Sequence, residues 1–319
     1  MLSRVADNLY WITRYLERAE HTARLLDLNL HQMLDQTPES AALRWQRVHA
    51  ALRMTLPVDA PNDAYRITNS LTFDLSNDAS IVSYVMAARE NARQVREQIS
   101  TEMWEQLNQL SLHIRRTKME TIWQSEPHEF FQAVKNGAHL FHGITNATIC
   151  HNEGWHFLRL GRFIERAVNT AALLNSHLTS IIERQQVSSE PLDYVELVGV
   201  LKSCTAFEAY CQTYTADVRP NTIAEFLLLS AECPRSVRFA VEMVQATLQE
   251  IARITRKPGA PSVWPGVSAR RLNTDRWTKS SPTICTSFWK TSSAAARRFT
   301  PPFIQGKRIT FRIKTTRLI

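Results

Sequence analysis

One segment of the sequence occurs twice, 148 residues apart. Residues 14–30 and 162–178 share nine identities in seventeen positions, among them the charged pairs Arg14/Arg162, Glu17/Glu165 and Arg18/Arg166. Apolar residues recur three and four positions apart in both copies, which predicts two amphipathic helices. Arg, Glu and Arg at i, i+3 and i+4 then share one face of each helix. Two such helices predict a pseudo-symmetric helical core with charged groups at matching places.

The rest of the first 254 residues also has helical periodicity. We expect helices at about 2–34, 39–54, 77–119, 125 onward, 152–184, 192–214, 221–229 and 234–254. The first and the fifth of these contain the repeated Glu-Arg pair, so we call them the ER helices. No stretch alternates as a strand does. The expected fold class is therefore all-α, a helical bundle with two pseudo-equivalent ER helices.

Charge divides the chain into two unequal parts. Residues 1–254 hold 24 basic and 29 acidic residues, whereas residues 255–319 hold 14 basic residues and one acidic residue, Asp275. The second part also contains six of the 13 prolines and shows no helical period. We expect a helical domain at 1–254, with halves of about 1–124 and 125–254, followed by an irregular basic tail at 255–319.

The composition indicates a cytoplasmic protein. Hydrophobic residues make up 44% of the chain, but no apolar run approaches the length of a membrane span, and the N-terminus has no apolar signal core. Five cysteines occur without a CxxC pair, which fits reduced thiols better than disulfides.

The charged stripes of the ER helices are the main candidates for a functional site. Apolar neighbours such as Leu16 and Ile164 place part of each stripe against another helix. A buried Arg-Glu network there fixes the packing register, or it presents guanidinium groups to an anionic ligand. We favour the structural network. Its candidate members include three residues of another Arg- and Glu-rich helix, for which a solvated face is the simpler interpretation: Arg14, Glu17, Arg18, Arg89, Glu90, Arg93, Arg162, Glu165 and Arg166.

Other motifs are weaker. Glu153 and His156 have the Glu-x-x-His spacing of di-iron bundles, but that chemistry needs two such motifs and the sequence has one, so we expect no metal. Cys150 beside His151 lacks an orienting third group, and we expect a core cysteine. No Gly-rich phosphate loop occurs, and we expect no cofactor. Whether the protein is an enzyme is left open.

Several segments together resemble the bacterial alpha-E family, an all-helical domain named for its ER motif. They are Met1-Leu-Ser-Arg-Val-Ala-Asp7, Arg14-Tyr-Leu-Glu-Arg-Ala-Glu20, Ala88-Arg-Glu-Asn-Ala-Arg93, Glu153-Gly-Trp-His156, Gly161-Arg-Phe-Ile-Glu-Arg166, Cys204-Thr-Ala-Phe-Glu-Ala-Tyr210 and Pro234-Arg-Ser-Val-Arg238. The resemblance covers residues 1 to about 254. The second copy departs from the first in having Val168 where the first has Glu20.

The resemblance implies a context rather than a mechanism. Members of this family typically accompany a circularly permuted ATP-grasp ligase and a transglutaminase-like protein, which implies a system for peptide ligation or modification. It implies no catalytic residues. We therefore expect a non-catalytic partner or scaffold of such a system. An enzyme or carrier-binding module that uses the Arg and Glu stripes is the alternative. Nucleic-acid binding through the basic tail is a second, less favoured alternative.

The tail differs from the acidic helical segment that the resemblance implies there. A reading frame shifted by one base encodes Asp across Trp277-Thr278, Leu across Phe288-Trp289 and Glu across Trp289-Lys290, because few codons are possible at these pairs. With permitted codons elsewhere, this frame gives a helical sequence like that of the family. We hypothesise a frameshift, in the gene or its sequencing, between about Ile254 and Trp264.

Overall fold

A computed structural model describes residues 1–32, 38–54, 63–125, 127–187, 194–215 and 217–255. These residues belong to the first of two compact units, Met1–Ala269; the second unit, Arg270–Ile319, lies outside the described residues. The expected basic tail and the hypothesised frameshift also concern residues outside the description, and both stay predictions.

The described part of the chain consists of α-helices and contains no strand, which confirms the predicted all-α class. The first six helices are α1 (Ser3–Gln32), α2 (Pro38–Ala51), α3 (Ala64–Thr72), α4 (Ile81–Gln94), α5 (Thr101–Arg116) and α6 (Met119–Gln124). The next six are α7 (Pro127–Thr148), α8 (Glu153–Val187), α9 (Tyr194–Ser203), α10 (Phe207–Tyr214), α11 (Pro220–Leu229) and α12 (Val237–Thr255).

Two long helices expected from the sequence are each broken in the structure. The helix expected at 77–119 divides into α4 and α5, joined by the short 3₁₀ helix Arg96–Gln98. Ser80 and Ser100 each accept a hydrogen bond from a backbone N–H of the following turn, so each caps a new helix. The helix expected at 192–214 ends before Thr205, whose φ of 47° is outside the helical range.

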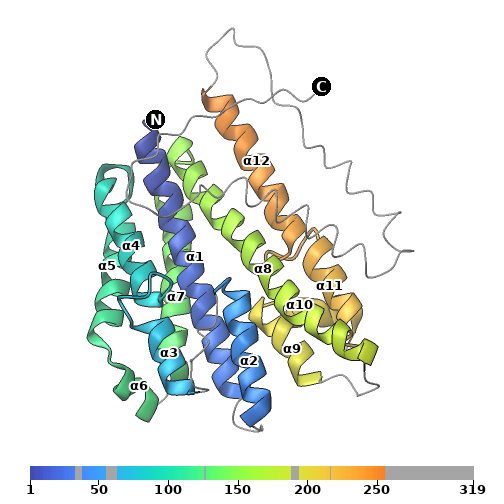
Figure 1. Cartoon of the computed structure of the whole chain (residues 1–319). Coiled ribbons are helices and arrows are strands. Elements are labelled where there is room, and N and C mark those ends of the chain that lie inside the picture. The colour runs from blue at the N-terminus through green and yellow to red at the C-terminus, as the bar shows by residue number, and fades with distance from the viewer. Residues whose placement is uncertain (33–37, 55–62, 126, 188–193, 216, 256–319) are drawn as a thin grey trace, which may run out of the picture. The chain divides into compact units, whose positions relative to one another are not determined.

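The ER helices are α1 and α8, and they lie side by side and run in the same direction (Figure 1). The N-terminal amine contacts Glu153 Oε2 at 2.8 Å, and Thr13 Oγ1 donates a hydrogen bond to the Leu158 carbonyl at 2.7 Å. Their backbones come closest at Gly161, where an added Cβ would lie 2.2 Å from the Tyr10 carbonyl oxygen. Only glycine permits this approach.

Other helices enclose this pair. Helices α4 and α7 pack on α1, while α12 packs on α8, and α5 packs against both α4 and α7 (Figure 1). Fully buried side chains of α1 form much of the central core, among them Leu9, Ile12, Leu16 and Leu26. Apolar residues at this spacing are what bury one face of each helix.

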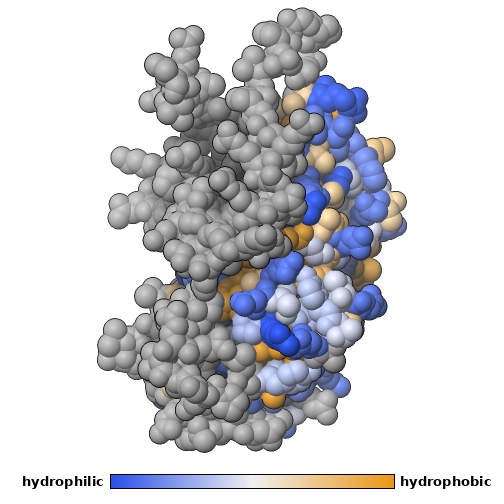
Figure 2. Space-filling view, turned by 90° about the vertical axis from the view of Figure 1, so that its right-hand side faces the viewer, coloured by the Kyte–Doolittle hydropathy of each residue, from blue (hydrophilic) through white to orange (hydrophobic). Residues whose placement is uncertain are grey.

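Some apolar residues of α12 remain exposed. Val241 and Ile254 are 42% and 41% exposed, whereas Val85 of α4 is 1% exposed. Figure 2 shows the side of the molecule on which α11 and α12 lie, where apolar and hydrophilic side chains are intermixed among the coloured atoms. None of the helices in the described residues is long and apolar enough to cross a membrane.

Candidate functional site

The two ER helices exchange charged partners reciprocally. Glu165 of α8 pairs with Arg14 and Arg18 of α1, with Arg18 Nε 3.1 Å from Glu165 Oε1. Glu17 of α1 pairs in turn with two arginines of α8: Nε of Arg166 is 3.0 Å and Nε of Arg162 is 3.4 Å from Glu17 Oε1. Each glutamate of the repeat is therefore neutralised by both arginines of the other copy.

Four further residues join these pairs. The ion pairs form two adjacent clusters, one on Glu165 and one on Glu17 and Glu20, which together we call the charged seam: Arg14, Glu17, Arg18, Glu20, Arg24, Arg53, Arg162, Glu165, Arg166 and Arg235. Glu20 and Arg24 come from α1, Arg53 follows α2, and Arg235 precedes α12. The seam thus joins α1 and α8 to the turn after α2 and to the turn before α12.

The Glu165 carboxylate is shut off from water, although Arg18 and Arg53 beside it are 21% and 36% exposed. Glu165 and Arg14 are both 0% exposed, and Arg14 also donates a hydrogen bond of 2.5 Å to the hydroxyl of Tyr10. Arg53 Nη2 donates to Glu165 Oε1 at 2.8 Å. Arg53 has a φ of 62°, a conformation that non-glycine residues adopt rarely, and its ion pair holds it against Glu165.

Aromatic rings close this end further. The guanidinium of Arg18 lies 5.6 Å from the ring centre of Trp11, 5.9 Å from that of Tyr15 and 5.8 Å from that of Tyr84 in α4. Cation–π contacts of this kind stabilise a cation by about 0.5 to 2 kcal/mol, more as it is removed from water. The rings therefore cover much of Arg18, whose side chain remains 21% exposed.

The Glu17 end has different neighbours. Arg235 bridges two carboxylates, with Nη2 2.9 Å from Glu20 Oε2 and Nη1 3.5 Å from Glu17 Oε2, and Arg24 also pairs with Glu20. His142 of α7 is buried, with Nε2 3.1 Å from Glu17 Oε1. His139, on the same helix, lies near Glu20 and is 47% exposed.

All three glutamates of the seam are held ionised. Burial alone would raise their pKa values, but the guanidinium groups outweigh it and lower the pKa of Glu17, Glu20 and Glu165 well below the usual range. Burial, followed by the charge of Arg162, lowers the pKa of His142 to about 4, so this ring is neutral near pH 7. None of the three carboxylates can exchange a proton near neutral pH.

A cavity of ≈ 590 Å³ opens beside the Glu17 end of the seam. Its wall includes Arg162 and Arg166 from α8, Arg235 before α12, and His139 and His142 from α7. Three arginines that line one cavity can donate several charged hydrogen bonds to the oxygens of an anion such as phosphate.

A separate group could hold a metal ion. Asp27, His31 and His128 each offer one ligand atom, and these atoms lie within 4.8 Å of one another. Lys135 Nζ, however, already lies 2.6 Å from Asp27 Oδ2, and His128 Nδ1 lies 2.8 Å from Asp27 Oδ1. A bound cation would compete with the lysine for the carboxylate.

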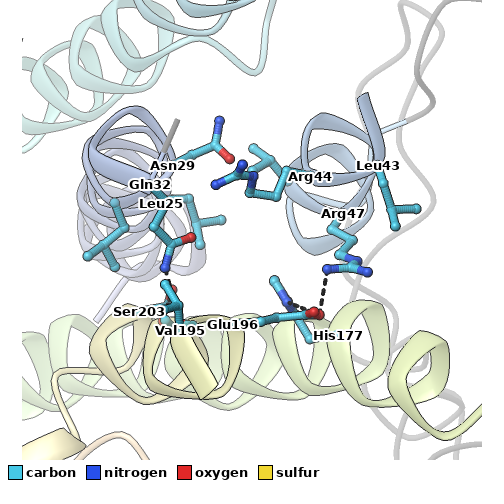
Figure 3. Close-up of a pocket in the computed structure, with 13 residues that line it drawn as sticks. Leu25, Asn29, Gln32, Leu43, Arg44, Arg47, His177, Val195, Glu196 and Ser203 are labelled. Atoms are coloured by element: carbon cyan, nitrogen blue, oxygen red, sulfur yellow. Dashed lines mark hydrogen bonds and ion pairs between the residues drawn. The ribbon is translucent and has the colours of Figure 1, made fainter. Parts of the chain in front are cut away.

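A second, smaller cavity of ≈ 100 Å³ lies among α1, α2, α8 and α9. Figure 3 shows Arg47 and His177 pointing toward Glu196, with Arg47 Nη1 2.5 Å and His177 Nδ1 3.9 Å from Glu196 Oε1. Gln32 donates a hydrogen bond to the Val195 carbonyl on the opposite side. These contacts join the helices around the cavity.

The structure separates the remaining candidates from the seam. Arg93 and Glu90 form an exposed ion pair, and Arg89 Nε donates to Asn108 at 2.6 Å, so the Arg- and Glu-rich part of α4 does not join the seam. Glu153 pairs with the N-terminal amine, whereas His156 is buried. The expectation of a core cysteine at position 150 was wrong, because Cys150 is exposed at the turn before α8.

Sequence reasoning missed Arg53, His142 and Arg235. The helices predicted at 39–54 and 234–254 include Arg53 and Arg235, but the structure places both residues in turns, after α2 and before α12. His142 lies on a helix whose register against α1 the sequence does not define. Only the segment around Arg235, one of those that carried the resemblance, offered a signal for any of the three.

The Alpha-E family, described as a predicted alpha-helical domain with a conserved ER motif, matches residues 1–276. The chain belongs to this family.

Similar proteins include an uncharacterised protein of Mycobacterium bovis and two uncharacterised proteins of Mycobacterium tuberculosis. Each is 24% identical over 270 residues, which cover 78% of this chain and 30% of the relative. The chain thus spans less than a third of the length of these relatives. No solved structure shows significant similarity to it.

Proposed function

We propose that this protein is a non-catalytic helical partner or scaffold of a peptide-modification system that contains an ATP-grasp ligase and a transglutaminase-like protein. The observation that carries the proposal is the state of the ER glutamates. Glu17 and Glu165 are buried, each contacts several guanidinium groups, and their pKa values lie far below neutral. Carboxylates held in this way join helices and do not transfer protons.

The length of the relatives gives further support. In the mycobacterial proteins, the matching segment makes up 30% of a longer chain. A helical module joined to other sequence in one polypeptide is suited to act beside another domain. We propose that this chain acts beside a partner in the same way.

Copurification tests this proposal. The full-length chain would be tagged, coexpressed with the ATP-grasp ligase of the same organism, and isolated with and without ATP. We expect the ligase to be retained and to lose activity when the helical chain is omitted. A ligase that is fully active alone and is never retained would contradict the proposal.

The cavity beside Glu17 favours a second candidate, a module that binds a ligand or carrier through the seam. Glu17→Gln separates the two roles when ligase binding and folding are measured on the same sample. If the protein is only a scaffold, the variant should lose ligase binding in proportion to the fraction of protein that is unfolded. A ligand-binding module changes its affinity for the ligand while the protein remains folded.

A further inference from the structure

The charged seam contains more positive than negative charge. Its ion pairs tie seven arginines to three glutamates, and the neighbouring His142 is neutral near pH 7. Most of these side chains are largely removed from water. A buried, uncompensated positive charge is costly unless an anion or water reaches it.

Arginines of the seam reach solvent at both ends, Arg53 with 36% of its side chain exposed and Arg162 with 30%, but those of the Glu17 end gather around a cavity. At the Glu165 end, Arg18 is covered by three aromatic rings. At the Glu17 end, Arg162, Arg166 and Arg235 line the cavity of ≈ 590 Å³. The ion pairs of this end tie four arginines to two glutamates, so an anion in the cavity could neutralise its excess positive charge.

Of the three arginines at the cavity, Arg162 has the weakest ion pair. Its Nε makes no hydrogen bond and is 3.4 Å from Glu17 Oε1, a carboxylate that Arg166 approaches at 3.0 Å. Burial, followed by the charge of Arg166, lowers the pKa of Arg162 to about 10. Its side chain is 30% exposed, so the guanidinium is accessible from the cavity.

We infer that this cavity binds the phosphoryl group of a small anionic ligand, through Arg162 with support from Arg166 and Arg235. A tetrahedral dianion has enough acceptor oxygens for several guanidinium groups at once. Its charge also offsets the excess of the seam. The inference goes beyond the scaffold role and holds whether or not a ligase binds.

Gly143 provides a precise way to test the site. It lies on α7 at the cavity, and an added Cβ would meet nothing within 4 Å. Gly143→Asn and Gly143→Asp place side chains of nearly the same shape there. They differ in a full negative charge, so a difference in anion binding reports electrostatics rather than space.

The measurement is calorimetric titration of the full-length protein with inorganic phosphate and separately with ATP, at constant ionic strength set with chloride. We expect binding of at least one of them. Gly143→Asp should weaken it by about tenfold or more, and Gly143→Asn by much less. Arg162→Gln should also weaken it by about tenfold or more, because it removes a charged donor.

Arg238→Gln is the matched control, because Arg238 is a nearby arginine on α12 that pairs with Glu242 and does not line the cavity. Binding of phosphate alone would indicate a free anion, and binding of ATP alone would indicate a nucleotide; each supports the inference. Neither ligand binding, or equal affinities for the Asp and Asn variants, would overturn it. Equal losses from Arg162→Gln and Arg238→Gln would overturn it too.

Discussion

The two ends of the charged seam are built from the same repeated residues, yet their surroundings differ. Glu165 meets three arginines in a space that Trp11 and Tyr84 help to close. Glu17 also meets three arginines, but beside a neutral histidine and an open cavity. A repeated motif therefore fixes which charges meet, while the non-repeated helices decide whether water or a ligand can reach them.

Removing the charge of Glu165 should have the largest effect. Glu165→Gln leaves Arg14 and its neighbours without their counter-charge in a closed space, and we expect the free energy of unfolding to fall by about 3 to 5 kcal/mol. Urea unfolding followed by circular dichroism measures it. Glu90→Gln, in an exposed ion pair, is the control and should cost less than about 1 kcal/mol. Equal losses in the two variants would show that the buried ion pairs of Glu165 contribute no more to stability than the exposed pair of Glu90.

Glu17→Gln should be less damaging than Glu165→Gln. Water or an anion in the cavity can solvate Arg162 when Glu17 loses its charge, so we expect a loss of about 1.5 to 3 kcal/mol. When the same unfolding experiment is repeated with added phosphate, the free energies of unfolding of Glu17→Gln and of the parent protein should differ by less. A larger loss for Glu17→Gln than for Glu165→Gln would reverse the comparison between the two ends.

Acid should destabilise the open end first. Burial is the main cause that lowers the pKa of His142 and of His21 to about 4 in the folded protein, against about 6.5 for a histidine exposed to water. The unfolded chain thus binds protons more readily below pH 6.5, and stability falls until the pH reaches the folded-state pKa.

Between pH 7 and 5, each histidine should reduce the free energy of unfolding by about 2 kcal/mol. In His142→Gln, the free energy of unfolding should therefore fall by about 2 kcal/mol less between pH 7 and 5 than in the parent protein. Urea unfolding at both pH values measures this difference. Below pH 4.5 the glutamates add a further loss, because their pKa values are lowered by folding and the unfolded chain takes up their protons first. Unchanged stability between pH 7 and 5 would show that His142 is not neutral in the folded protein.

The closest approach of the ER helices should tolerate no side chain. Gly161→Ala brings a methyl group against the Tyr10 carbonyl, and the two helices must separate, at a cost of about 1 to 3 kcal/mol. Gly143→Ala is the matched control in another helix, where the open space lets the higher helix propensity of alanine raise stability by up to about 1 kcal/mol. Thermal unfolding of both variants gives the sign of each effect. A Gly161→Ala variant as stable as the parent would contradict the short interhelical distance.

The smallest effect should come from opening the closed end. Tyr84→Leu removes one of the three rings over Arg18, and we expect a loss of about 1 kcal/mol. If the rings are what exclude anions from this end, the variant should also gain a weak second phosphate site, which calorimetry would detect. Phosphate binding that is unchanged in stoichiometry would show that Glu165 and its arginines remain closed by other groups.

The sequence predicted the helices and the pair of equivalent charged segments, because both follow from local spacing. It also placed Arg14, Glu17 and Glu165 among the candidate residues. It did not predict the third arginine at each end: Arg53 and Arg235 reach the seam from turns, and only the tertiary packing of α2 and α12 brings them there. The break between α4 and α5 was missed because helical periodicity continues across it, although Ser100 caps α5 through a local hydrogen bond from the Met103 N–H.

The reciprocal pairing between α1 and α8 has the form of an isologous interface, in which residue i contacts j and j contacts i. One copy of the Arg-x-x-Glu-Arg segment contains both halves of the interaction, so two identical segments can hold each other. Joining the copies in one polypeptide removes the need for both to remain identical. Glu20 in one copy and Val168 in the other show the freedom that this covalent link allows.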